Sequence, residues 1–132
     1  MKHRMGPAVL VILLLLCLTG CGGNQNMANG YQQITPKEAK EMMNAQDVLI
    51  LDVREQYEYD SGYISGAVLL PVGTITVESA SAVIPAKDTV VLVYCRSGNR
   101  SKKASAKLAE LGYTNIYEFG GINTWPYGIT TE

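Results

Sequence analysis

Residues 89–101 read TVVLVYCRSGNRS, so that a continuous apolar run ends at a cysteine and passes directly into a short polar loop. An apolar run of this length is typical of a strand that is covered by helices on both faces. Residues 99–111 carry apolar side chains on one helical face, and Gly112 follows as a C-terminal cap. The sequence therefore predicts a buried strand, a tight loop and a helix, with Cys95 at the start of the loop.

The alternation of strands and helices continues on both sides of this stretch. Residues 48–53 (VLILDV) form a second apolar run, and a helix over 36–44 is indicated by the capping signals Thr35, Pro36 and Glu38. Shorter candidates are strands at 31–34 and 114–119 and a helix at 76–83. Strands that alternate with helices through short turns predict an α/β fold, with a mostly parallel, doubly wound sheet and helices on both faces.

The first 20 residues have the order of a processing signal. Basic residues precede an apolar run of about a dozen residues, which is shorter than the roughly 20 that a membrane-spanning helix needs. Residues 18–21 (LTGC) resemble the lipobox of bacterial lipoproteins, in which the cysteine receives a diacylglyceryl group.

We therefore expect a signal peptide at 1–20, a lipidated Cys21 with a flexible tether over 21–30, and one domain over 31–132. This arrangement would hold the domain through its N-terminal lipid at a bacterial cell membrane or envelope, on the extracytoplasmic side. The alternative is that Cys21 is an ordinary thiol after a signal-peptidase site.

Charge and cysteine content narrow the classes of function. The chain has 11 basic and 12 acidic residues, a formal net charge of −1, and nothing in it suggests nucleic acid binding. Of the three cysteines, Cys17 would leave with the signal and Cys21 would be capped by lipid. Cys95 then remains as a lone thiol without a disulfide partner in the domain, which marks it as a candidate reactive group in an exported protein.

The loop after Cys95 favours an anion. A glycine-bearing loop at the start of a helix turns backbone N–H groups inward, and the helix dipole adds partial positive charge. Such sites lower the pKa of a thiol from about 8.5 to about 3.5–7.5. Basic residues also gather here, at Arg96, Arg100, Lys102, Lys103 and Lys107. The alternative interpretation is that Cys95 is a small apolar residue at a strand end and that the lysines form a solvated face.

The loop at 95–101 (CRSGNRS) resembles the active-site loop of the rhodanese family of single-domain sulfurtransferases. Two further stretches share the resemblance. Residues 51–67 look like the N-terminal signature of that family, and Gly120-Gly121-Ile122 with Trp125 looks like its C-terminal one. The resemblance covers residues 31–129. Tyr63 departs from it, because the family usually has a histidine in that triplet; we interpret the histidine as structural.

The resemblance implies a doubly wound fold and a two-step sulfur transfer. Cys95 would take a sulfane sulfur from a small anionic donor such as thiosulfate, and would pass it from a persulfide to a thiol or a cyanide-like acceptor. Backbone amides of the loop would hold the outer sulfur, and Arg96 and Arg100 could attract the donor. The candidate binding residues are Arg96, Ser97, Gly98, Asn99 and Arg100. No metal or organic cofactor is called for.

Three residues outside the loop are also assigned roles. Asp52 ends a strand and is a candidate to hydrogen-bond the loop backbone, or else a cap or turn residue. Arg54 is expected to pair with Glu55 or Glu58 and to support the scaffold. Trp125 is expected to pack the last helix against the sheet.

Two other functions use a similar loop. Cysteine phosphatases and related arsenate reductases have five residues between cysteine and arginine, whereas four separate Cys95 from Arg100, which leaves a tighter cradle. A non-catalytic sulfur carrier or interaction module would form the same persulfide, and only repeated turnover would separate it from an enzyme.

Overall fold

The computed structural model describes residues 29–132, so the predicted signal segment and Cys21 lie outside the described part. Five strands form one sheet in the order β1-β5-β4-β2-β3, and every strand pair in it is parallel. The strands are β1 (Gln32–Gln33), β2 (Leu49–Asp52), β3 (Val68–Leu69), β4 (Val91–Cys95) and β5 (Ile116–Gly121).

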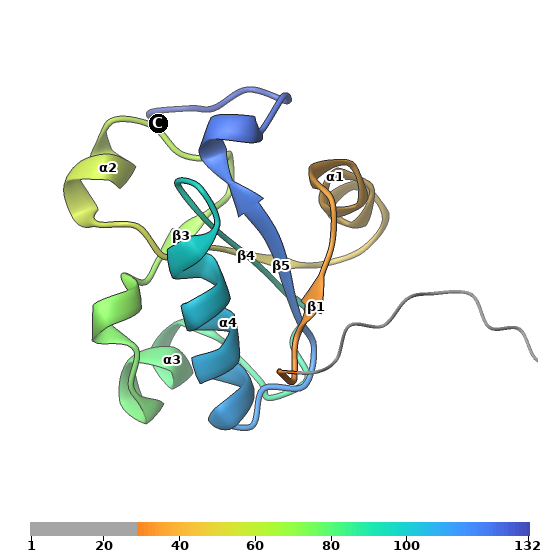
Figure 1. The fold of residues 1–132 in the computed structure, drawn as a ribbon, viewed down its shortest axis with the longest axis vertical. Coiled ribbons are helices and arrows are strands. Elements are labelled where there is room, and N and C mark those ends of the chain that lie inside the picture. Colours follow the sequence, from red (N-terminus) through yellow and green to blue (C-terminus); the bar gives the residue numbers. More distant parts are fainter. Residues whose placement is uncertain (1–28) are drawn as a thin grey trace, which may run out of the picture.

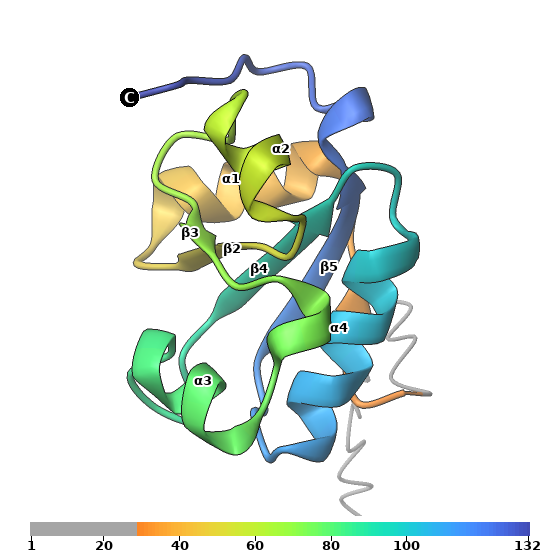
Figure 2. The same ribbon diagram turned by 90° about the vertical axis from the view of Figure 1, so that its left-hand side faces the viewer.

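Helices cover both faces of the sheet, which confirms the predicted doubly wound α/β architecture (Figures 1 and 2). One face is covered by α1, and the other by α3 and α4, while α2 lies near the carboxyl ends of the strands (Figure 1). The helices are α1 (Pro36–Ala45), α2 (Gln56–Asp60), α3 (Val77–Val83) and α4 (Asn99–Glu110), with 3₁₀ turns η1 (Val72–Thr74) and η2 (Ile122–Thr124). No helix within residues 29–132 is both long enough and apolar enough to cross a membrane.

The sheet separates two apolar clusters because successive side chains of a strand point to opposite faces. In β4, Val93 and Cys95 belong to the cluster under α3 and α4, whereas Leu92 and Tyr94 belong to the cluster under α1. All five residues of β4 are buried, as the continuous apolar run at 89–94 predicts. The central strand therefore presents its terminal cysteine to the α4 side of the sheet.

The predicted helices and main strands are present, and their ends differ from the predicted ones by one or two residues. Thr35 caps α1, with Pro36 at the start of the helix and Glu38 completing the capping box, as predicted. Helix α2 was not predicted, because a five-residue helix without a buried face has no apolar period to recognise. Trp125 packs with Phe119 in the cluster under α1, so the expectation that it packs against the last helix is wrong.

Helix α4 carries a buried hydroxyl, on Ser105, that has no hydrogen-bond partner among residues 29–132. A buried polar group without a partner costs roughly 1–3 kcal/mol, and alanine is a better helix former than serine. We predict that Ser105→Ala raises the free energy of unfolding by up to about 1 kcal/mol, measured by urea denaturation. The matched comparison is Thr35→Ala, which removes a cap and should lower stability by about 1 kcal/mol. A clear loss of stability in Ser105→Ala would contradict this account.

Candidate active site

The thiol of Cys95 lies where β4 ends and the loop to α4 begins. The backbone N–H of Gly98 donates to Cys95 Sγ at 3.0 Å. Gly98 is the N-cap of α4 with φ of 110°, a left-handed conformation that favours glycine and turns its amide back toward the strand end. The sulfur thus accepts a backbone hydrogen bond at the positive end of a twelve-residue helix.

Two opposing effects act on the ionisation of this thiol. Cys95 is 1 % exposed, and burial raises its pKa. The hydrogen bond between the sulfur and the Ser101 hydroxyl, and those from the amides of Ser101, Gly98 and Ser97, lower it. The hydrogen bonds outweigh burial, so the pKa of Cys95 lies below its ordinary value.

The loop is held in place by close packing against the end of β5. A Cβ atom built on Gly121 would lie 1.9 Å from the carbonyl oxygen of Arg96 and 2.6 Å from the nitrogen of Ser97. Asn123 N–H donates to the same Arg96 carbonyl at 3.2 Å. The β4–β5 ladder is irregular between Val93 and Cys95, where the strand turns into the loop. Only a glycine at position 121 allows the two backbones to approach this closely.

The two arginines of the loop differ in whether they are free to bind an anion. Arg100 donates to both carboxylate oxygens of Glu58, at 2.6 and 2.9 Å. This pairing lowers the pKa of Glu58 to about 2 and raises the pKa of Arg100. Arg96 is exposed, has no ion pair within residues 29–132, and lines a cavity of about 240 Å³ with Tyr57 and Ile122. The structure therefore leaves Arg96 free to meet an anion, whereas Arg100 is already neutralised.

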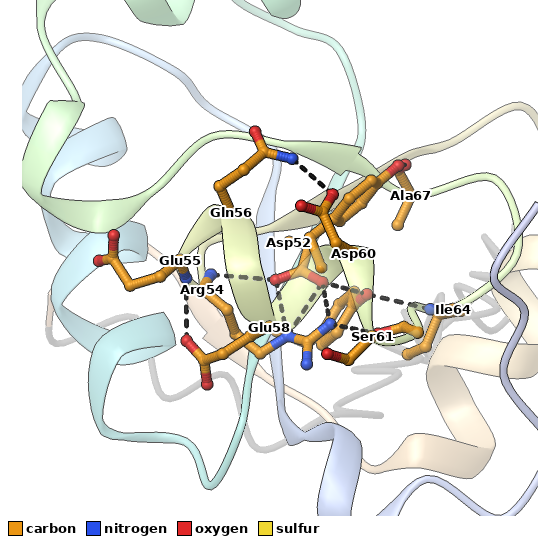
Figure 3. A network of polar contacts seen from close by, with 12 residues as sticks. Asp52, Arg54, Glu55, Gln56, Glu58, Asp60, Ser61, Ile64 and Ala67 are labelled. Carbon is orange, nitrogen blue, oxygen red and sulfur yellow. Dashed lines mark hydrogen bonds and ion pairs between the residues drawn. The ribbon is translucent and has the colours of Figure 1, made fainter.

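Asp52 and Arg54 form a polar network at the end of β2 (Figure 3). It includes Tyr94, which belongs to the cluster on the other face of the sheet from Cys95. Arg54 Nη2 lies 2.7 Å from Asp52 Oδ2, and both side chains are buried. Arg54 also donates to the Gly62 carbonyl, and Tyr94 Oη donates to Asp52 Oδ2 at 2.6 Å. Burial raises the pKa of Tyr94, and its hydrogen bond to Asp52 adds to this effect.

For Asp52 the structure supports the second of the two alternatives. Asp52 does not hydrogen-bond the loop at 96–100, because the register pairs it with Tyr94, whose side chain points away from the α4 side. It is a turn residue, whose Oδ1 accepts from the backbone N–H of Arg54 at 3.0 Å. The partners expected for Arg54 are wrong. Arg54 pairs with Asp52 and not with Glu55 or Glu58. Glu58 instead reaches Arg100, 42 residues further along the chain.

Tyr63, at the position of the family histidine, lies between α2 and the end of the chain. Its ring stacks on Tyr59 with centroids 4.1 Å apart, and its backbone pairs with Thr130 in an antiparallel bridge. Its hydroxyl donates to the Glu132 carbonyl. These contacts give Tyr63 a role in holding the C-terminal segment.

The structure also brings two residues to the thiol that the sequence analysis gave no role. Ser101 Oγ lies 3.4 Å from Cys95 Sγ and 2.6 Å from Glu118 Oε1. Glu118 could have been noticed in the sequence, because it is a charged residue inside the otherwise apolar strand at 116–119, and charged residues are rarely buried without a functional or structural role.

Within residues 29–132, no cluster of three or more histidine, cysteine or acidic side chains is placed to hold a metal ion.

Several known proteins are similar to this chain in sequence and in fold. Residues 35–126 match the profile of the rhodanese-like domain. The thiosulfate sulfurtransferase GlpE of Coxiella burnetii is 35% identical over 96 residues, which cover 72% of this chain and 87% of that protein. A sulfurtransferase of Allochromatium vinosum is 38% identical over 88 residues, which cover 66% and 79%. The structure of a rhodanese with anions from E. coli superposes with a TM-score of 0.60 at 28% identity, covering 65% of this chain and all of that one.

The close approach of Gly121 to the loop gives a direct test of the amide cradle. We predict that Gly121→Ala displaces the loop from the sulfur, raises the pKa of Cys95 and slows its alkylation by iodoacetamide at pH 7 by about tenfold, since one pKa unit is a tenfold change in thiolate. Gly73→Ala is the matched control, because a Cβ there would have no atom within 4 Å. Equal alkylation rates in the two folded variants would show that the cradle does not activate the thiol.

Proposed function

Because this chain belongs to the rhodanese-like family, we propose that it is a sulfurtransferase that moves a sulfane sulfur from thiosulfate to a thiophilic acceptor through a persulfide on Cys95. The hydrogen bond from the Gly98 amide to Cys95 Sγ is the observation that supports this most directly. It favours the ionised sulfur that a nucleophile requires, in a loop that ends on the N-terminus of a helix.

The proposed reaction has two displacement steps. In the first, the Cys95 thiolate attacks the outer sulfur of thiosulfate; a new S–S bond forms, the S–S bond of thiosulfate breaks, and sulfite leaves with the bonding electron pair. In the second, an acceptor such as cyanide attacks the outer sulfur of the persulfide, thiocyanate leaves, and the Cys95 thiolate is restored. The loop amides that stabilise the thiolate would stabilise the anionic outer sulfur in the same way.

The surroundings of the thiol favour a small anionic donor. Cys95 is buried, so the loop has to move slightly to admit the donor, and a compact molecule needs the smallest movement. Arg96 is the exposed cation next to the thiol, and its cavity leads to the loop. We therefore assign the attraction of the donor to Arg96, since Arg100 is occupied by Glu58.

We also propose that the domain works at a membrane surface. The basic and apolar order of residues 1–20 and the LTGC motif at 18–21 support lipidation of Cys21. Metabolic labelling with a palmitate analogue, lost in Cys21→Ser, would test this anchor. Recovery of unlabelled protein in the soluble fraction would contradict it.

The persulfide can be detected directly by intact mass spectrometry. We predict that thiosulfate adds the mass of one sulfur atom, that cyanide removes it, and that the cycle repeats with continued formation of thiocyanate. Cys95→Ser should abolish both the mass gain and the turnover, because the serine hydroxyl is not ionised near neutral pH. Activity that persists in this variant would refute the assignment of the nucleophile, and a single loading without turnover would indicate a sulfur carrier.

The role of Arg96 can be separated from that of the surrounding positive charge. We predict that Arg96→Gln raises KM for thiosulfate roughly tenfold and changes kcat less, because a charge-assisted hydrogen bond contributes about 1.5–3 kcal/mol. The difference should shrink as NaCl is added, since salt screens exposed charges. Lys103→Gln, an exposed charge on the same segment, is the control and should leave KM close to that of the unmodified protein. Equal values of KM in the two variants would exclude donor attraction by Arg96.

A further inference from the structure

A buried chain of hydrogen bonds runs from the thiol to a carboxyl group on β5. Ser101 Oγ lies 3.4 Å from Cys95 Sγ and 2.6 Å from Glu118 Oε1. All three residues are buried, with Glu118 only 3 % exposed. Glu118 Oε1 also accepts from Gly120 N–H at 2.8 Å. The chain lies on the α4 side of the sheet, where Cys95 ends β4 and Glu118 lies inside the neighbouring strand β5, in register with Val93.

Ser101 has a single hydroxyl proton and more than one acceptor for it. The carboxylate of Glu118 is the nearest, and the carbonyl oxygens of Gly98 and Gly120 lie at 2.9 and 3.3 Å. While that proton points to Glu118, Ser101 can only accept the hydrogen bond of the Cys95 thiol. The Ser101 hydroxyl can therefore donate to the Cys95 thiolate only when Glu118 is itself protonated and no longer accepts the hydrogen bond from Ser101.

The charges around this chain do not neutralise a second anion. From α4, Arg100 is paired with Glu58 and also attracts the Cys95 thiolate, but it does not contact Glu118. Lys102 is exposed on the edge of the cavity that Glu118 lines. Arg96 of the loop faces the other cavity, and Asp52 and Arg54 neutralise each other across the sheet. The segments at β1, the start of α1 and η2 border the Glu118 cavity with uncharged side chains: Gln33, Ile34, Thr35, Pro36 and Thr124. Two negative charges this close together in a buried site repel each other strongly.

We propose that Glu118 is a positioning residue that takes the proton of Cys95 through Ser101, so that the thiol and the carboxyl group share one negative charge. The Cys95 S–H bond breaks as an O–H bond forms at Ser101 Oγ, and the original Ser101 O–H bond breaks as an O–H bond forms at Glu118 Oε1. The electron pair stays on sulfur, and nothing is oxidised or reduced. Ser101 then donates to the thiolate, and the Glu118 acid donates to Ser101.

The position of Glu118 gives this proton a separate route to solvent. Glu118 lines a cavity of about 360 Å³ together with Gly98, Lys102 and Thr124. This cavity shares no lining residue with the one that contains Arg96 and Tyr57. Proton exchange and donor entry would thus use different sides of the loop. The inference deepens the proposed sulfur transfer and rests on it for its biological use, but its test needs no sulfur donor.

The test is the pH dependence of alkylation of Cys95 by iodoacetamide. Two coupled groups titrate in two macroscopic steps, so we expect two steps in the unmodified protein and one in Glu118→Gln, whose amide can still donate to Ser101. Ser101→Ala breaks the chain and should slow alkylation at pH 7 about tenfold. Ser105→Ala removes a buried hydroxyl one turn away on the same helix and should keep both steps. A two-step profile that persists in Glu118→Gln, or an unchanged rate in Ser101→Ala, would overturn the proposal.

A measurement on the unmodified protein covers the case in which the Glu118 variant does not fold. Alkylation of Cys95 removes the thiolate, so the shared charge should move to Glu118. We expect the carboxyl carbon of Glu118 to shift, in the ¹³C NMR spectrum at neutral pH, from the position of an acid to that of a carboxylate. A carboxyl carbon that does not move on alkylation would overturn the proposal. Because neither experiment contains thiosulfate, their results are independent of whether the chain transfers sulfur.

Discussion

The hydrogen bond from the Gly98 amide to the Cys95 sulfur is the interaction on which the site depends. It exists because three separate features coincide. Strand β4 ends at the sulfur, Gly98 adopts a left-handed conformation, and α4 begins at the next residue. Gly121 adds a fourth constraint. Because it has no side chain, β5 can pack closely against the backbone of Arg96 and Ser97, just after the end of β4. The chemistry of the thiol is therefore a property of how four backbone segments meet.

The alternation of side chains along the strands divides the polar interior into two networks. Asp52 and Arg54 lie on the α1 side and neutralise each other, while Tyr94 donates to Asp52, so this network links β2 to β4 and to the Gly62 carbonyl. Cys95, Ser101 and Glu118 lie on the α4 side, and no cation among residues 29–132 forms an ion pair with Glu118. The charges of a buried ion pair stabilise each other and are therefore unreactive. A buried anion without a cation is less stabilised, and such groups are common at reactive sites.

Much of this structure could be predicted from the sequence, because its main elements carry strong local signals. The apolar runs at 48–53 and 89–94 and the capping residues of α1 identify elements without knowledge of the rest of the fold. The partners of Asp52 could not be predicted in the same way, since the register of β2 against β4 decides whether it faces Tyr94 or Cys95. The pairing of Arg100 with Glu58 likewise joins residues 42 positions apart, through the unpredicted helix α2.

Glu118 shows how a local inconsistency can indicate function. A strand of sequence Ile116-Tyr117-Glu118-Phe119 places a carboxyl group among apolar neighbours, which costs free energy unless the group is hydrogen-bonded. Its hydrogen bonds to Ser101 and Gly120 reduce this cost but supply no positive charge. If stability alone were selected at this position, an apolar side chain would fit a buried strand better. The presence of an acid beside the one group that must lose a proton is thus most simply explained by proton exchange with that group.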